Sequence, residues 1–294
     1  MSPPVLSGGG RIHAPSSTFW SLMDAIQPIG QCRVELPFKP NPAQSATRTC
    51  LRILGRMFPV PRRSEALTLA RTVDETVPPD LPRRLFLNAC DQSALLLSGG
   101  WNQLDLTPLQ SLGDPWTRKG ISTLFISMHH GNWEWLAGIL HVLRSDSIGV
   151  ARSAHNPWGQ RLIAHVRHFH KTPIFYDEAG YRKAHRTLKH GGLVAFLADQ
   201  RPPSQGEPGS WLGCSTRVSP LPRRWARTIQ PEFWTGHLTP QTSTSYELEL
   251  FRYPSSALLH WDQSLDALFL PLVRNHPDWH FGFFHKRLVP RETP

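Results

Sequence analysis

The chain has 294 residues, with 32 Lys and Arg against 22 Asp and Glu, and 39% of its residues are hydrophobic. This length suits one large domain or two small ones, and it is long enough to bury a core. The 14 Phe and 11 Trp exclude a low-complexity disordered chain. The four cysteines are far apart, which is typical of free thiols in a reducing compartment; they are Cys32, Cys50, Cys90 and Cys214.

Hydropathy and charge along the sequence further limit the class of protein. No stretch approaches the roughly 20 apolar residues that span a bilayer, and residues 1–15 lack the apolar region of a signal peptide. The net charge of +10 favours acidic partners, and residues 144–190 hold nine Lys and Arg against three Asp and Glu. No nucleic-acid-binding motif accompanies this charge. We therefore expect a soluble or peripheral protein that meets anionic lipid or phosphorylated substrates, with no nucleic acid partner.

The first part of the chain predicts helices. Residues 1–45 are rich in Pro, Gly, Ser and Gln and contain one short apolar helix, Phe19–Ile26, so we expect a flexible or surface-anchoring segment. Residues 46–120 follow a helical period, with a helix after Ser64 and another from Leu85 to Leu97. The sequence thus predicts a helical N-terminal segment in front of the remaining chain.

From residue 121 onward, strands and helices alternate. This pattern predicts an α/β fold with a mixed, mainly parallel central sheet flanked by helices, and residues 121–294 form the catalytic core of a domain spanning 46–294. The predicted strands are 121–128, 147–151, 172–176, 193–198, 232–236 and 246–253. The predicted helices are 133–143, 157–170, 179–190, one from about 220, and 264–273, and 201–213 is predicted to be a loop.

Polar residues follow three of the predicted strands: His129, Arg152 and Asp199. In such sheets, ligands bind beyond the carboxyl ends of the strands. The first position is the most informative, because His129 is followed five residues later by Glu134 at the start of a helix. Gly131 permits a sharp reversal between them and Asn132 is a suitable helix cap. We expect Glu134 to fold back and orient His129 as a general base.

Other interpretations of this motif remain. His129 or His130 can be a hydrogen-bonding residue at the strand end while Glu134 only satisfies a helix N-terminus. A metal site is not favoured, because the spacing differs from the HExxH pattern. His130 is interpreted as a structural residue or as a support for the residues that contact substrate, and Asp199 as a support for the loop that follows it. Four tryptophans are candidates for lipid headgroup contact, although core packing is favoured for each single one; they are Trp116, Trp211, Trp225 and Trp234.

The segment from His129 to Glu134, His-His-Gly-Asn-Trp-Glu, resembles the H-x4-D/E signature of glycerolipid-type acyltransferases. With Gly-Asn-Trp inside it, it is similar to the lauroyl and myristoyl transferases of lipid A biosynthesis. The resemblance extends over about residues 45–290 and is densest from 121 to 213. The further matching positions are Arg152, Asn156-Pro157, Arg167, Leu188, Gly192, Asp199-Gln200, Trp211-Leu212-Gly213 and the segment from Trp279 to Arg287.

The resemblance implies an activity and a set of roles. The family transfers a fatty acyl chain from acyl carrier protein or coenzyme A to a hydroxyl of a phosphorylated glycolipid, without a covalent acyl-enzyme and with no metal or other cofactor. It implies catalysis by His129 and Glu134, and we expect oxyanion stabilisation by Arg152 or by backbone N–H groups around Gly131 and Asn132. Implied substrate-binding residues are Arg152, Asn156 and Arg167, and implied supporting residues are Gly131, Asn132, Asp199 and Gln200.

The expected location is the cytoplasmic side of the inner membrane, with peripheral attachment, because the family's transmembrane anchor is not found in this sequence. The expected partners are acyl carrier protein, an anionic membrane surface and a glycolipid acceptor. Two alternatives remain: an acyltransferase acting on another glycolipid, such as a phosphatidylinositol mannoside, and a lipid-binding homologue with a decayed site. A serine hydrolase is not expected, because Gly-x-Ser-x-Gly does not occur.

Overall fold

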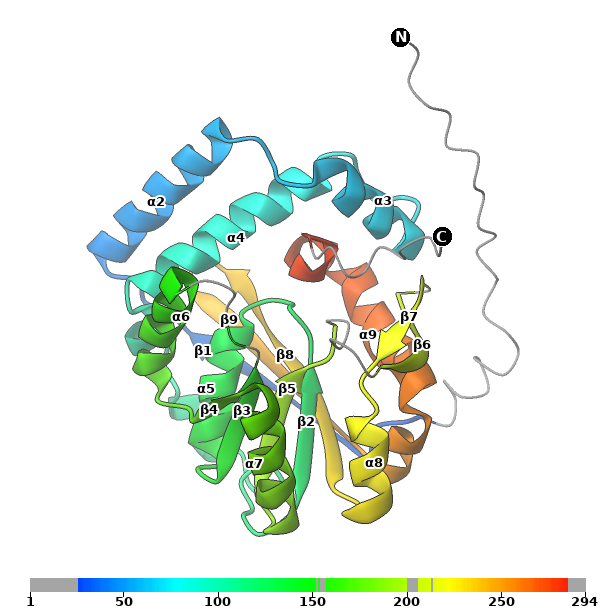
Figure 1. The fold of residues 1–294 in the computed structure, drawn as a ribbon. Coiled ribbons are helices and arrows are strands. Elements are labelled where there is room, and N and C mark those ends of the chain that lie inside the picture. Colours follow the sequence, from blue (N-terminus) through cyan, green and yellow to red (C-terminus); the bar gives the residue numbers. More distant parts are fainter. Residues whose placement is uncertain (1–25, 152, 154–156, 200–205, 213, 285–294) are drawn as a thin grey trace, which may run out of the picture.

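A computed structural model of the chain describes residues 26–151, 153, 157–199, 206–212 and 214–284. Its centre is a seven-stranded mixed sheet flanked by helices (Figure 1), which confirms the predicted α/β class. The strands of this sheet are β1 (Gly30–Pro37), β2 (Thr123–Ser127), β3 (Ser147–Ala151), β4 (Ile174–Tyr176), β5 (Leu193–Leu197), β8 (Glu232–Thr242) and β9 (Ser245–Tyr253).

The order of the strands places the parallel part of the sheet in the middle and at one edge. The order is β1-β9-β8-β2-β5-β3-β4. The pairs β8–β2, β2–β5, β5–β3 and β3–β4 are parallel, whereas β1–β9 and β9–β8 are antiparallel. Strands β2 and β5 are therefore direct neighbours, although about 65 residues separate them in the chain.

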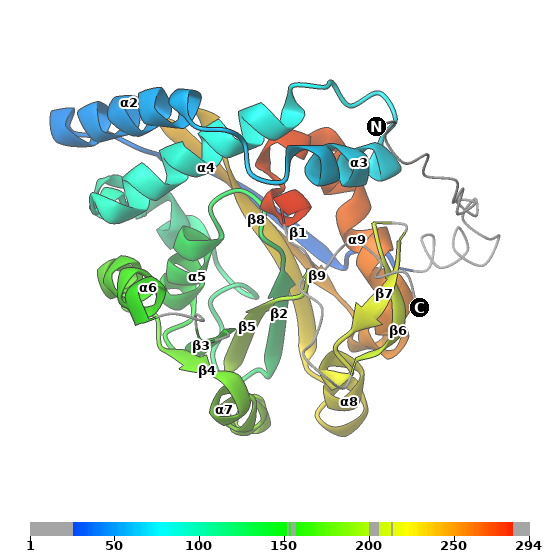
Figure 2. The same cartoon turned by 45° about the horizontal axis from the view of Figure 1, so that its top comes forward.

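Helices cover both faces of the sheet, and a further group crosses its carboxyl edge (Figures 1 and 2). Helix α5 packs on one face, and α7, α8 and α9 pack on the other. Helices α2, α3 and α4 lie at the edge where the parallel strands end. The helices are α2 (Pro42–Met57), α3 (Arg63–Val73), α4 (Leu81–Leu97), α5 (Trp133–Leu143), α6 (Pro157–His170), α7 (Asp177–Lys189), α8 (Leu221–Thr228) and α9 (Trp261–Asn275).

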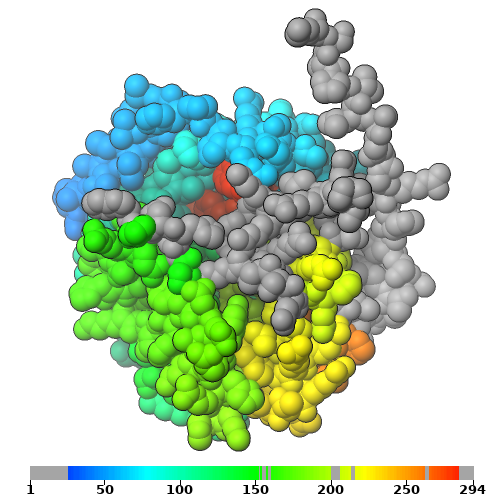
Figure 3. Space-filling view, viewed as in Figure 1, coloured from blue at the N-terminus to red at the C-terminus, as the bar shows by residue number. Residues whose placement is uncertain are grey.

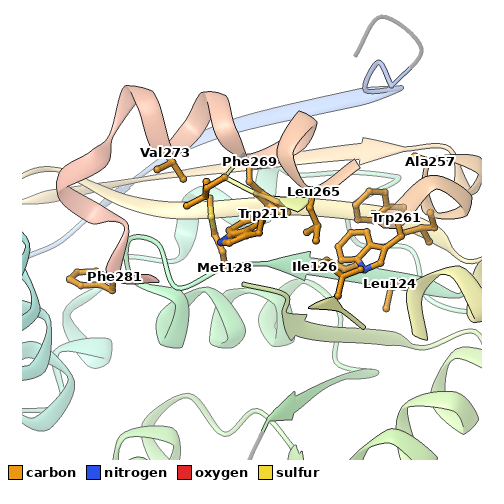
Figure 4. Close-up of a cluster of buried hydrophobic side chains, with 14 of the residues drawn as sticks. Leu124, Ile126, Met128, Trp211, Ala257, Trp261, Leu265, Phe269, Val273 and Phe281 are labelled. Atoms are coloured by element: carbon orange, nitrogen blue, oxygen red, sulfur yellow. The ribbon is translucent and has the colours of Figure 1, made fainter. Parts of the chain in front are cut away.

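Strand β2 is buried on both sides, as expected for a strand at the centre of a covered parallel sheet. Phe125 points toward α5, whereas Leu124 and Ile126 point into the opposite cluster. Figure 4 shows that opposite cluster, in which Met128 joins Trp211 and the side chains of α9. Because Met128 is anchored in this core, the residue that follows it is held at a fixed place at the edge of the sheet.

The N-terminal part differs from its prediction. Residues 30–37, expected in a flexible or anchoring segment, form β1, which pairs along its whole length with β9. That part of the prediction is wrong because alternating exposed and half-buried residues in β1 carry too weak a hydrophobic signal for a strand. The helices α2 to α4 consequently follow a strand of the sheet. The predicted helix Phe19–Ile26 lies almost wholly outside the described residues.

Two further findings concern the expected loop and the tryptophans. The expected loop 201–213 contains β6 (Glu207–Trp211), which forms an antiparallel hairpin with β7 (Cys214–Val218). The tryptophans weighed as headgroup contacts are all buried, so core packing is confirmed for each of them; they are Trp116, Trp211, Trp225 and Trp234.

Candidate functional site

Two polar residues meet at the carboxyl edge of the sheet because their strands are neighbours in register. Ser127, the last residue of β2, pairs with Leu197, the last residue of β5. His129 and Asp199 each follow two residues later, so both leave the sheet at the same level. The backbone N–H of Ala198 donates to the carbonyl of Ser127 at 2.8 Å, which keeps the two strand ends together.

His129 and Asp199 form a doubly hydrogen-bonded pair. The imidazole Nδ1 of His129 lies 2.8 Å from Oδ1 of Asp199, and the backbone N–H of His129 donates to Oδ2 at 2.9 Å. Because a carboxylate only accepts hydrogen bonds, Nδ1 carries the proton and the basic lone pair lies on Nε2. An imidazole whose tautomer and orientation are set by a carboxylate has the arrangement of a general base.

The electrostatics of Asp199 favour its ionised form. The carboxyl group is fully buried, and burial by itself raises its pKa. The charge of His129 and the two hydrogen bonds from that residue outweigh burial, and the pKa of Asp199 falls to about 2. The carboxylate therefore stays charged at neutral pH and can stabilise the imidazolium that forms when His129 accepts a proton.

Aromatic rings and backbone hydrogen bonds fix the position of His129. The ring of Trp133 lies 5.1 Å from the imidazole, and Phe281 lies 5.3 Å from Trp133. The backbone N–H of Phe281 donates to the carbonyl of His129 at 2.8 Å. Phe281 belongs to a short 3-10 helix, Phe281–Phe284, so a segment near the end of the described chain supports the site.

Gly131 makes the turn that joins the strand to α5. Its φ is +58°, and a Cβ at this position would collide with the carbonyl oxygen of Leu238 in β8. Asn132 caps the helix, as predicted, because its side chain accepts from the N–H of Trp135 at 3.2 Å. This turn brings Trp133 over the imidazole and directs the next residue, Glu134, around the helix toward α6.

Glu134 does not orient His129, which corrects the prediction. Both of its carboxylate oxygens accept hydrogen bonds from Arg167 of α6 at 2.9 Å, in a two-pronged ion pair. Arg167 also donates to the hydroxyl of Tyr176 at 3.0 Å. The carboxylate that contacts the imidazole is Asp199 instead. Glu134 and Arg167 therefore tie α5 to α6 behind the site.

Arg167 was expected to bind substrate, and its surroundings give it a different role. Burial lowers the pKa of its guanidinium, whereas the hydrogen bonds and charge of Glu134 raise it by more, so the net pKa is raised. His170 lies beside the same carboxylate, with its Nε2 4.0 Å from Glu134. Burial lowers the pKa of His170 to about 4, so this imidazole is neutral at neutral pH. The charges of this group are thus balanced internally by Glu134 and Arg167.

His130 is a core residue, in agreement with its structural interpretation. It is completely buried, and burial together with neighbouring imidazoles places its pKa well below the usual value. The ring stacks on His280 at 6.1 Å and lies 5.9 Å from His237 and 6.5 Å from His276. The side chain of His130 therefore points away from the solvent-facing side of the strand end, where His129 is 15% exposed.

The backbone donors proposed for the oxyanion are already used. The N–H of Gly131 donates to the carbonyl of Trp279 at 2.9 Å, and that of Asn132 donates to the carbonyl of Leu238 at 2.8 Å. The expectation that these two groups stabilise an oxyanion is therefore wrong, because the turn at Gly131 is itself bonded to two neighbouring segments. The other expected donor, Arg152, lies outside the described residues, as do the implied site residues Asn156 and Gln200.

A polar pocket lies beside the motif and was not predicted. It has a volume of about 250 Å³ and opens between α2, α4 and the hairpin of β8 and β9. Arg48 and Arg52 of α2 line it and contact Asp91 of α4 at 3.4 Å and 2.7 Å. Trp279, whose carbonyl is bonded to Gly131, lines it as well. The arginines were missed because a solvated helix face has the same sequence pattern.

Comparison with known proteins gives no family assignment: no family model matches the chain, and no curated protein matches it significantly. Within the described residues, no group of three or more His, Cys, Asp or Glu side chains is arranged to hold a metal ion. No helix of the described segments is both long and apolar enough to cross a membrane. The site thus consists of an imidazole oriented by a buried carboxylate, with a nearby pocket lined by two arginines.

Proposed function

We propose that this chain is an O-acyltransferase that moves a fatty acyl group from a thioester of acyl carrier protein or coenzyme A to a hydroxyl of a phosphorylated glycolipid. The observation that carries the proposal is the pair of His129 and Asp199 at the carboxyl edge of a mainly parallel sheet. The resemblance of the His129–Glu134 segment to glycerolipid-type acyltransferases, and to the lipid A family among them, supplies the reaction class.

In this proposal His129 acts as the general base. Its Nε2 takes the proton of the acceptor hydroxyl while the hydroxyl oxygen attacks the thioester carbonyl carbon. The tetrahedral intermediate then collapses, the C–S bond breaks, and the imidazolium returns the proton to the leaving thiolate. Asp199, ionised and fully buried, stabilises the imidazolium between these two steps. No acyl-enzyme forms, and all atoms end in the ester and the free thiol.

Positive charge near the site supports an anionic acceptor. Arg48 and Arg52 line a pocket whose wall also includes Trp279, next to the turn at Gly131. A planar guanidinium is well suited to bind phosphate oxygens. Peripheral attachment to the cytoplasmic face of the inner membrane is part of the proposal, because a lipid acceptor is reached at a bilayer surface.

The proposal is tested by incubating the purified chain with acyl-acyl carrier protein or acyl-CoA and a phosphorylated glycolipid in detergent. Mass spectrometry measures the acylated lipid, and a thiol reagent measures the released thiol. We expect equal amounts of both products, and a loss of about 10²–10⁴-fold in the His129→Ala variant. Replacement of His185, an exposed residue on α7, by Ala is the matched control and should leave the rate unchanged.

Two results would overturn the proposal. Thiol release without acylated lipid would identify a thioester hydrolase, in which water replaces the acceptor. Acyl transfer at the same rate in wild type and His129→Ala would show that this imidazole is not the base. Acyl transfer to a phosphatidylinositol mannoside in preference to a lipid A precursor would keep the chemistry and change the acceptor.

A further inference from the structure

The C-terminal end of α2 exposes large apolar side chains. Ile53, Leu54, Met57 and Phe58 are 51%, 46%, 75% and 60% exposed. The spacing of Ile53, Leu54 and Met57 places them on one side of α2, and Phe58 follows directly after the last residue of the helix. Single exposed apolar residues are ordinary, but four within six residues form a contiguous patch of the kind that marks an interaction surface. We call these four residues the apolar tip.

The apolar tip is held in place on the body of the protein. Gly55, on the other side of α2, lies so close to α4 that a Cβ would come within 3.0 Å of the sulfur of Cys90. Arg83 of α4 donates hydrogen bonds to the carbonyls of Gly55 at 3.0 Å and Phe58 at 2.8 Å. These bonds satisfy the carbonyls at the end of the helix. The tip is therefore a fixed, outward-facing surface that the fold presents.

Arginines surround the tip. Arg48, Arg52 and Arg56 lie in α2 and Arg62 and Arg63 follow it, and no Asp or Glu occurs from residue 41 to 64. Some of this charge is compensated, since Asp91 contacts the first two arginines and Glu65 lies 3.8 Å from Arg62. The surface remains positive. Apolar side chains bordered by cationic ones are typical of helices that lie in the interface of an anionic bilayer.

The tip is placed at the same end of the molecule as the site. Helix α2 forms the upper left margin in Figures 1 and 3, beyond α4 and at the carboxyl edge of the sheet. Helix α4 connects to the site, because Asn88 donates to the carbonyl of Asp278 at 2.8 Å, next to Trp279. A surface docked through the tip would therefore lie on the side where the proposed acceptor is bound.

We propose that the apolar tip, with Arg56 and Arg63 beside it, docks this protein onto anionic lipid bilayers by inserting into the headgroup region. This proposal rests on the peripheral attachment in the proposed function and assigns it to a surface. It replaces the basic region 144–190 as the principal contact, because that region has charge but only scattered exposed apolar residues, such as Leu162 and Tyr181. An acidic carrier protein would match the arginines, yet four projecting apolar side chains favour a lipid phase.

The test is co-sedimentation of the full chain with vesicles of phosphatidylcholine containing about one third phosphatidylglycerol. Met57→Ser/Phe58→Ser should lower the partition coefficient about tenfold, because two apolar side chains no longer enter the interface. Arg56→Gln/Arg63→Gln should lower it about tenfold at low salt and less at high salt. Acyl transfer to a detergent-solubilised acceptor should be unchanged in both variants.

Matched controls distinguish the tip from the remaining surface. Val142→Ser/Leu162→Ser removes two side chains that are about half exposed on α5 and α6, and should bind as the wild type does. Arg186→Gln/Lys189→Gln removes two charges from the basic region 144–190 and should have the smaller effect of the two charge variants. Equal melting temperatures would show that all variants are folded.

The outcomes separate the two proposals. If the wild type binds vesicles and the tip variants bind them equally well, the tip assignment is overturned and peripheral attachment remains. No binding of the wild type to anionic vesicles would overturn attachment and tip together. A tip-dependent dimer in sedimentation, or tip-dependent binding of acyl carrier protein in place of vesicles, would also overturn the assignment.

Discussion

Asp199 is close to His129 in space and Glu134 is close to it in the chain, and the surroundings of the two carboxylates differ. Asp199 follows a neighbouring strand, is fully buried and accepts two hydrogen bonds from His129. Glu134 lies five residues from His129 in the chain, yet both of its oxygens bind Arg167. The difference shows that the register of β2 and β5 brings together residues that are far apart in the chain. The start of α5, in contrast, turns a residue near His129 in the chain away from it. Asp199 orients the imidazole of His129, and Glu134 joins two helices.

The largest expected effect concerns the carboxylate of the base. Asp199→Ala should lower the acyl transfer rate by about 10²–10⁴-fold, because the imidazole loses its orientation and the charge that stabilises its protonated form. The variant combined with His129→Ala should be hardly slower than the worse single variant, since the two residues act as one unit. Single-turnover rates measure this. If the rate loss of the double variant equals the product of the two single losses, the two residues do not act as one unit.

Replacing the other carboxylate should act on stability. Glu134→Gln leaves the guanidinium of Arg167 buried without its charge partner, and we expect the free energy of unfolding to fall by about 3 kcal/mol. Urea denaturation measures it. Arg167→Met in the same chain should restore part of the loss, which a double-mutant cycle detects. A folded Glu134→Gln variant that has lost its turnover would instead place Glu134 in the catalytic machinery.

The dependence of stability on pH should reveal the ionised state of Asp199. Its pKa is about 2 in the folded chain and near the ordinary value of 3.8 after unfolding, so the unfolded state binds more protons between these values. The ionised carboxylate therefore contributes about 2 kcal/mol to stability above pH 4, and this contribution disappears as the pH falls toward 2. Urea unfolding at several pH values should show a weaker acid dependence for Asp199→Asn than for wild type.

The smallest expected effect concerns Tyr176, which contacts the ion pair of Glu134 and Arg167. Tyr176→Phe removes the hydroxyl that accepts a hydrogen bond from Arg167, and should cost about 1 kcal/mol of unfolding free energy. Turnover should stay within about twofold of wild type, because the aromatic ring remains. Thermal unfolding followed by an acyl transfer assay measures both. A larger loss of activity than of stability would indicate that this network reaches the reacting groups.

The sequence predicted the elements between 121 and 199 well, because buried apolar runs and amphipathic periods are strong local signals. The helices 133–143 and 157–170 and the strand 147–151 have the predicted bounds. Strand β1 was missed since only one of its residues is buried, and the β6–β7 hairpin was missed since Pro and Gly dominate its first strand. Local patterns also carry no information about the long-range pairing of β1 with β9.

The site was predicted in part for the same reason. Placing His129 and Asp199 after two strands needed only local signals, but pairing them required the strand order, in which β5 lies directly beside β2. The direction of Glu134 depends on the φ of +58° at Gly131 and on the position of α6. The pocket with Arg48 and Arg52 depends on how α2 packs against α4. These contacts join segments that are far apart in the chain, so local sequence patterns do not predict them.

The backbone bonds from Phe281 to His129 and from Gly131 to Trp279 have a consequence for biosynthesis. Protein chains emerge from the ribosome starting with their N-terminus, so the loop of His129 appears about 150 residues before the segment that braces it. Strands β2, β3 and β5 can associate while translation continues, but the loop of His129 is fixed only after residues 279–281 arrive. A nascent chain therefore lacks the bonds that hold the loop of His129, and only the finished protein presents this residue in a braced position.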